Sequence, residues 1–112
     1  RVLSPEPCSD LMFPVVGMSD PLDAEESAAL AHVLPLWTQE GGTLVRIFEA
    51  PTFPTAIEWV VLIAEVAERM DHHPDIDIRW RRLRVTLTTH SAGSQVTHLD
   101  VQLAQAIDAI AV

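Results

Sequence analysis

The histidines are the residues of this sequence best suited to proton transfer near neutral pH. The chain has five of them but no Lys and no Tyr, which excludes lysine bases and phenolic acids. His72 and His73 are adjacent and follow a predicted helix, and His90 falls at the end of a predicted strand. Element ends are where a rigid scaffold presents reactive groups. These three are therefore candidate catalytic residues, although solvated loop histidines with no task remain an alternative.

Two carboxylates accompany the histidine pair. Glu68 lies four residues before His72 and would share its face if the helix continued, and Asp71 is the immediate neighbour of His72. Either carboxylate could favour the charged imidazole and orient its ring. The alternative is that both are solvated charges at a helix end, where Asp71 would oppose the helix dipole.

A zinc site is the rival interpretation, because three imidazoles can hold a catalytic zinc ion. Adjacent histidines in a loop lack the i, i+4 helical spacing of a specific metal motif. His32 falls inside a predicted helix and His98 in the first turn of another, so we interpret both as surface or packing residues. We expect no metal and no cofactor, since the sequence also has no nucleotide-binding loop.

Composition restricts the function further. The chain has 112 residues, 16 acidic against 7 basic side chains and a formal net charge of -9, which suits one small domain and disfavours binding to nucleic acid. The single Cys8 excludes an intramolecular disulfide and favours a cytoplasmic protein. No apolar run is long enough to cross a membrane.

Four arginines (Arg79, Arg81, Arg82 and Arg84) are predicted to form a solvated strand face that pairs with carboxylates.

Hydrophobic periodicity and capping signals predict the elements. Residues 1–21, which hold four prolines, are predicted to form an irregular arm, and residues 22–112 the folded domain. The predicted elements are a helix from the capping box at Asp23 to Pro35, strands at 37–39 and 43–48 around Gly41-Gly42, a helix over 54–70, a strand over 76–88 and a helix from Thr97.

The apolar phase of the last strand flips between Trp80 and Leu83, which predicts a bulge or a break near Arg81-Arg82 that separates two strand pieces. The predicted order is α-β-β-α-β-α. We expect an α+β fold, with a small antiparallel sheet and helices packed on one of its faces.

One combination of residues resembles the signature of a known family. It consists of Glu68, His72-His73-Pro74, the aromatic Trp80, Thr89-His90 and Asp100. This pattern is similar to that of the pterin-4a-carbinolamine dehydratases, and the resemblance extends from about Leu22 to the C-terminus, with residues 1–21 outside it. Where the family usually has Gly-Gly-Leu/Ile-Thr after the third histidine, this chain has Gly93-Ser94-Gln95-Val96-Thr97, so the loop behind His90 is expected to have another shape.

The resemblance implies an α+β domain that forms a homodimer or homotetramer. It implies a hydro-lyase that dehydrates 4a-hydroxytetrahydropterin to quinonoid dihydropterin and recycles the tetrahydrobiopterin cofactor of aromatic amino acid hydroxylases. His72 and His90 would then be the acid/base pair, and His73 would help to hold the pterin ring. The implied substrate-binding or supporting residues are Glu68, Asp71, Pro74, Thr89, Ser91, Ala92 and Asp100.

The chemistry of the residues agrees with that activity. Expulsion of hydroxide from C4a needs a proton at the leaving oxygen and the loss of one from the adjacent nitrogen, which suits two imidazoles from separate elements. The alternative is a relative that keeps the fold but acts as a dimerisation or interaction module.

Overall fold

The computed structural model describes residues 20–111, and most of the predicted arm over 1–21 therefore lies outside the described residues. The elements, in chain order, are α2 (Ala24–Val33), β1 (Thr38–Glu40), β2 (Thr43–Glu49), α3 (Phe53–Met70), β3 (Asp75–Arg79), β4 (Arg82–Leu87), the short 3-10 helix η1 (His90–Ala92) and α4 (His98–Ile110). The predicted α+β class is confirmed. Within the described residues, no helix has the length and apolar character needed to cross a membrane.

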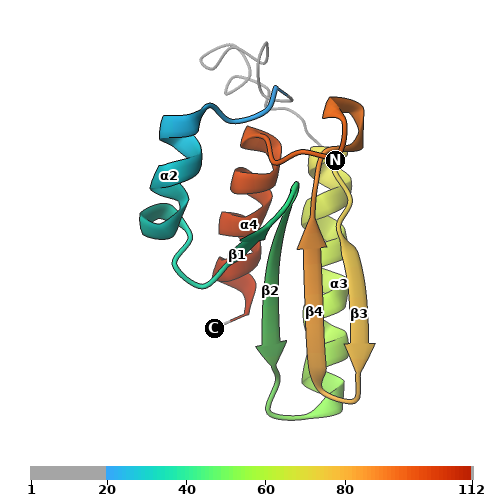
Figure 1. Ribbon diagram of the computed structural model, residues 1–112. Helices are drawn as coiled ribbons and strands as arrows, with labels where there is room; N and C mark the ends of the chain where they lie inside the picture. The colour runs from blue at the N-terminus through green and yellow to red at the C-terminus, as the bar shows by residue number, and fades with distance from the viewer. Residues whose placement is uncertain (1–19, 112) are drawn as a thin grey trace.

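The four strands form one antiparallel sheet in the order β1-β2-β4-β3. Helices α3 and α4 lie behind this sheet, and α2 packs beside α4 near β1 (Figure 1). The side chains between the layers form a single hydrophobic core, in which Leu44, Ile63, Leu83 and Leu103 are each 1% exposed or less. Burial of each such side chain contributes about 1.5–3 kcal/mol to folding.

The break predicted near Arg81-Arg82 is a hairpin turn rather than a bulge. β3 and β4 pair with each other, and Arg79 lies opposite Arg82 across the loop formed by Trp80 and Arg81. The turn reverses the chain, so the apolar residues of both strands face the same helices although their phase along the sequence differs. The observed order is therefore α-β-β-α-β-β-α, with one strand more than the predicted count.

The predicted boundaries are close to the observed ones. β1 starts one residue later than expected, at Thr38, and β4 ends at Leu87, so His90 belongs to η1 rather than to the strand. Asp23 caps α2 with the predicted capping box, in which its side chain accepts from the Glu26 amide and Glu26 accepts from the Asp23 amide. α4 begins with the second predicted box, between Thr97 and Asp100.

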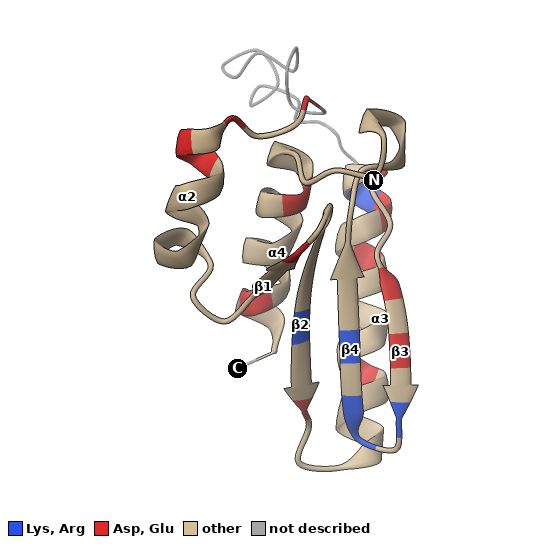
Figure 2. Ribbon diagram, viewed as in Figure 1, with Lys and Arg blue, Asp and Glu red and all other residues tan. Residues whose placement is uncertain are grey.

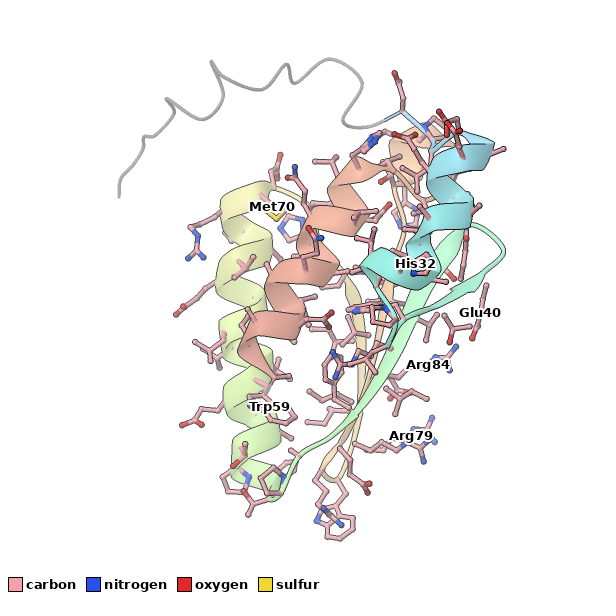
Figure 3. The ribbon with its side chains drawn as sticks, turned by 90° about the vertical axis from the view of Figure 1, so that its left-hand side faces the viewer. His32, Glu40, Trp59, Met70, Arg79 and Arg84 are labelled. Carbon is pink, nitrogen blue, oxygen red and sulfur yellow. The ribbon has the colours of Figure 1, made fainter. Side chains whose placement is uncertain are left out.

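Three of the four arginines of the β3–β4 hairpin pair with acidic residues, as predicted. The ion pairs are Arg79–Asp77 at 3.4 Å, Arg81–Glu49 at 3.7 Å and Arg84–Glu40 at 3.3 Å. β3 carries two acidic positions followed by a basic one, whereas the charged positions of β4 are all basic (Figure 2). Figure 3 shows the labelled side chains of Arg79 and Arg84 on the side of the sheet opposite α3 and α4. Exposed pairs of this kind contribute about 0–1 kcal/mol each.

Candidate functional site

One end of the molecule gathers the predicted site residues. At this end α3 finishes, β3 starts, β4 finishes and α4 starts, and η1 follows β4 (Figure 1). The antiparallel pairing of Asp75 with Thr86 fixes the start of β3 next to the end of β4. The segment with His72 and His73 is thereby brought to the same end of the sheet as the segment with Thr89 and His90.

A tight turn after α3 sends the two adjacent histidines in different directions. Asp71 adopts a left-handed backbone conformation (φ 52°, ψ 42°), and the His72 amide donates to the Ala67 carbonyl at 3.0 Å. Left-handed residues commonly end helices, and Asp tolerates this conformation better than most. His72 is buried after this turn, whereas the His73 side chain is 56% exposed. Pro74, half-buried, leads into β3.

His72 contacts a buried carboxylate that comes from α4. Its Nε2 atom lies 2.5 Å from Oδ1 of Asp100, and Asp100 is 0% exposed. The other oxygen of Asp100, Oδ2, accepts from the Thr97 amide at 2.9 Å and from the Thr89 hydroxyl at 2.8 Å. A carboxylate only accepts hydrogen bonds, so Nε2 of His72 carries the hydrogen and Nδ1 is left for other chemistry.

Thr97 and Thr89 complete this buried polar group. Their hydroxyl oxygens are 2.7 Å apart, and the side chains come from opposite ends of the loop that contains η1. Buried polar groups are costly unless they are hydrogen-bonded, and here each one has a partner. The network therefore fixes the position of Asp100, which in turn fixes the ring of His72.

Glu68 pairs with a different histidine from the one that the spacing indicated. Its Oε1 atom lies 3.0 Å from Nε2 of His73, and both side chains are exposed. The i, i+4 spacing toward His72 assumed a continuous helix, whereas α3 ends at Met70 and Asp71 turns the chain. His72 instead pairs with Asp100, 28 residues away in the sequence.

His90 is the first residue of η1 and is exposed. Its Nδ1 atom lies 3.4 Å from the Ser94 hydroxyl oxygen. Ser91 is exposed and Ala92 is half-buried. His90 is thus the solvent-accessible imidazole contributed by the β4 side of the site.

The two remaining histidines lie outside this group. His32 is exposed on α2, and Nε2 of His98 lies 2.7 Å from Oε2 of Glu26, which joins α4 to α2. The hydrogen bond from the Asp23 amide lowers the pKa of Glu26, and the hydrogen bond with His98 lowers it further. His98 therefore connects two helices through a half-exposed contact, which agrees with its interpretation as a surface or packing residue.

Two other features of the described residues bear on the type of site. Over residues 20–111, no cluster of three or more His, Cys, Asp or Glu side chains is arranged to hold a metal ion. A shallow hollow of about 220 Å³ lies on the open face of the sheet and is lined by Ile47, Asp77, Arg79, Arg82 and Arg84. It contains no histidine. The arrangement at the histidine end is thus one of oriented imidazoles paired with carboxylates, which suits acid/base chemistry.

Two residues of this end were missed as site residues by the sequence analysis. Thr97 was recognised only as a helix cap, although the capping box Thr97/Asp100 was the signal that both polar side chains meet there. Ser94 was noted only as a departure from a motif. Their contacts with Asp100 and His90 depend on how the loop folds, and periodicity does not report that.

The comparisons with known proteins agree on one family. The profile of the family described as "Pterin 4 alpha carbinolamine dehydratase" matches residues 20–110. A protein of Nocardia farcinica, provisionally named a pterin-4-alpha-carbinolamine dehydratase, is 49% identical over 90 residues, which are 80% of this chain and 94% of that protein. A Roseiflexus protein with the same provisional name is 50% identical over 88 residues, which are 79% of this chain and 92% of its own.

A solved structure gives the same result. The crystal structure of a Brucella melitensis protein, described as a transcriptional coactivator/pterin dehydratase, superposes with a TM-score of 0.78 and 33% sequence identity. The match covers 83% of this chain and all of that one. Residues 1–19 of the predicted arm lie outside the family match.

Proposed function

Because the chain belongs to the pterin-4-alpha-carbinolamine dehydratase family, a family of lyases, we propose that it dehydrates 4a-hydroxytetrahydropterin to quinonoid dihydropterin. The observation that carries the proposal is the contact between His72 and Asp100. It supplies an oriented imidazole at the end of the molecule where His73 and His90 also lie.

The reaction breaks the bond between C4a and its hydroxyl oxygen. The hydroxyl leaves as water after it receives a proton, and the nitrogen next to C4a loses its proton, so that one water molecule is removed in total. One group must donate and another must accept a proton on different sides of a flat ring. We assign these two tasks to His72 and His90, which come from the α3–β3 connection and from η1.

The remaining predicted residues are assigned supporting roles. His73, oriented by Glu68, would hold the pterin ring from the exposed side of the site, together with Ser91 and Ala92. Asp71 and Pro74 would set the backbone on either side of the histidine pair. Asp100 and Thr89 are buried, so in this proposal they act through His72 rather than on the substrate directly.

The decay of freshly generated 4a-hydroxytetrahydropterin, followed by ultraviolet absorbance, tests the proposal. The wild-type protein should accelerate this decay, and His72→Ala and His90→Ala should each lower kcat by about 10²–10⁴-fold, the usual contribution of a general acid or base. His32→Ala is the matched control, because this histidine is exposed on α2, outside the histidine end. Full activity in both site variants would refute the assignment.

A wild-type protein without any effect on the decay would instead favour the alternative function, an interaction module with the same fold. The observation that supports this alternative is the Brucella melitensis neighbour, which is described as a transcriptional coactivator as well as a pterin dehydratase. The link to aromatic amino acid hydroxylases is a proposal that follows from the dehydratase assignment, and the cytoplasmic location is a proposal that follows from the single cysteine.

We also propose that the chain forms a homo-oligomer through α3. Phe53, Ile57 and Val61 recur every four residues on this helix and are 47%, 40% and 52% exposed. Such a stripe can pack against the same stripe of a second copy about a two-fold axis. Native mass spectrometry should show dimers or tetramers that Val61→Glu disrupts. Arg69→Gln, an exposed change on the same helix with the same change in net charge, should not; monomers in the wild type would overturn the proposal.

A further inference from the structure

The loop that follows His90 is anchored at its base. Thr89 pairs with Gln95 through an isolated bridge, in which the Thr89 amide donates to the Gln95 carbonyl at 3.0 Å and the Ser94 amide donates to the Thr89 carbonyl at 3.1 Å. Gly93 and Ser94 both have positive φ, at 75° and 58°. Glycine adopts this conformation freely, whereas in Ser94 the Cβ atom makes the same backbone conformation strained.

The strained residue, Ser94, is the hydrogen-bond partner of the His90 ring among the described residues. The Ser94 hydroxyl oxygen lies 3.4 Å from Nδ1 of His90, a long contact between two exposed side chains. Hydrogen bonds in empty active sites are often long and tighten when substrate binds. Backbone strain is found preferentially at functional sites, where the surrounding structure maintains it.

A neighbouring turn holds Ser94 in this conformation. Gly42, in the turn between β1 and β2, lies so close to the loop that a Cβ atom on it would be 1.9 Å from the Ser94 carbonyl oxygen. The Gly42 carbonyl accepts from the Thr88 hydroxyl at 2.6 Å, which ties the turn to the end of β4. The turn and the loop can therefore approach this closely only because Gly42 has no side chain.

We propose that Ser94 is a positioning residue for His90, and that the contact of its backbone with Gly42 holds it in place. This inference rests on the proposed function, because it assigns His90 a part in proton transfer. The hydroxyl would fix the orientation of the imidazole at Nδ1 and leave Nε2 directed at the substrate. The loop at which this sequence departs from the family pattern would thus supply its own means of orienting His90.

Two substitutions of Ser94 separate positioning from stability. Ser94→Gly and Ser94→Ala both remove the hydroxyl, but only glycine relieves the strain at positive φ, so Ser94→Gly should be at least as heat-stable as Ser94→Ala. Both variants should nevertheless lower kcat by about two- to tenfold, the equivalent of one ordinary hydrogen bond, with little change in KM. The imidazole ¹⁵N shift of Nδ1 in His90 should move toward that of the exposed His32 in both.

The turn offers a matched pair of variants. Gly42→Ala should displace the loop, perturb the His90 imidazole resonances and lower kcat. Gly41→Ala lies in the same turn with open space around its Cβ and a φ of 61°, so it should lower thermal stability without moving His90.

Wild-type kcat and an unchanged His90 resonance in both Ser94 variants would overturn the inference, as would equal effects of Gly41→Ala and Gly42→Ala on His90. The His90 imidazole resonance can be measured in a protein that does not turn over substrate. If the wild-type protein does not dehydrate the pterin, the proposed function fails while the imidazole shifts still decide whether Ser94 orients His90.

Discussion

His72, in the α3–β3 connection, and Asp100 of α4 meet in the interior with Nε2 and Oδ1 2.5 Å apart. The second oxygen of Asp100 is held by the Thr97 amide and the Thr89 hydroxyl, so the carboxylate cannot rotate without the loss of a hydrogen bond. A ring held in this way has one orientation and one tautomer. That is the condition for efficient proton transfer at a defined substrate atom.

Asp100→Asn should therefore damage catalysis as well as stability. An amide can accept at only one of its two ends, which leaves either His72 or the pair Thr97 and Thr89 without its acceptor. We expect kcat to fall by roughly 10- to 100-fold, as for other residues that orient a reacting group, and the free energy of unfolding to fall by about 1–3 kcal/mol. Pterin decay and urea denaturation measure the two effects.

Asp77→Asn is the control for this change, since Asp77 is an exposed carboxylate on β3 that pairs only weakly with Arg79. It should change the free energy of unfolding by no more than about 0.5 kcal/mol. Wild-type kcat in Asp100→Asn would show that the orientation of His72 is irrelevant to the reaction.

The fold was largely predictable because local signals and periodicity agree with it. Both capping boxes, the apolar stripe of α3 and the Gly41-Gly42 turn act over a few residues, where sequence patterns are informative. The hairpin at Trp80 was only partly predicted. Its first loop residue has a positive φ of 58°, a position at which Asn or Gly gives the usual signal and Trp gives none.

The sequence indicated which segments meet at the histidine end, but not how their side chains pair. The resemblance placed His72, His73, His90 and Asp100 in one site, and the fold brings their segments to one end of the sheet. The spacing predicted that Glu68 would pair with His72. This was wrong, because the left-handed residue Asp71 turns the chain after α3 and His73 is the histidine that pairs with Glu68. Contacts across a loop, such as that of Asp100 with His72, have no local signature.

Glu68 should matter less for catalysis than Asp100 does. Its contact with His73 is exposed to solvent on both sides, and such pairs contribute about 0–1 kcal/mol. Glu68→Gln should therefore lower kcat/KM by no more than about fivefold, measured in the same decay assay. Glu65→Gln, one turn earlier on α3, should have no effect. A loss in Glu68→Gln as large as that in Asp100→Asn would mean that the carboxylate takes part directly.

Glu26 should make the stability of the domain sensitive to acid. Hydrogen bonds from the Asp23 amide and with His98 lower its pKa from the ordinary value of 4.5. A carboxyl group with a lowered pKa in the folded state stabilises the protein above its unfolded pKa, and the contribution is lost as the pH falls through the folded pKa. The difference in unfolding free energy between wild type and Glu26→Gln should be present at pH 7 and shrink below about pH 4.5.

Glu25→Gln provides the matched control in the same first turn of α2, where it removes the same charge without the two hydrogen bonds. Urea denaturation at several pH values measures all three proteins. A difference between wild type and Glu26→Gln that stays constant down to pH 3 would contradict the assigned role of Glu26.

Asp108 should stabilise the fold without influence on the reaction. Its Oδ1 atom accepts from the Trp37 indole at 2.8 Å and also pairs with Arg46, so it joins α4 to β2 and to the segment before β1. Asp108→Ala would leave both donors partly buried without their acceptor, at a cost of about 1–3 kcal/mol. Asp108 lies near the end of α4 that is remote from Asp100, so kcat measured well below the melting temperature should stay at the wild-type value.

Asp108→Asn, which keeps one acceptor, should recover part of the stability that Asp108→Ala loses, as measured by thermal denaturation. A fall in kcat without a fall in melting temperature would instead connect this cluster to the histidine site.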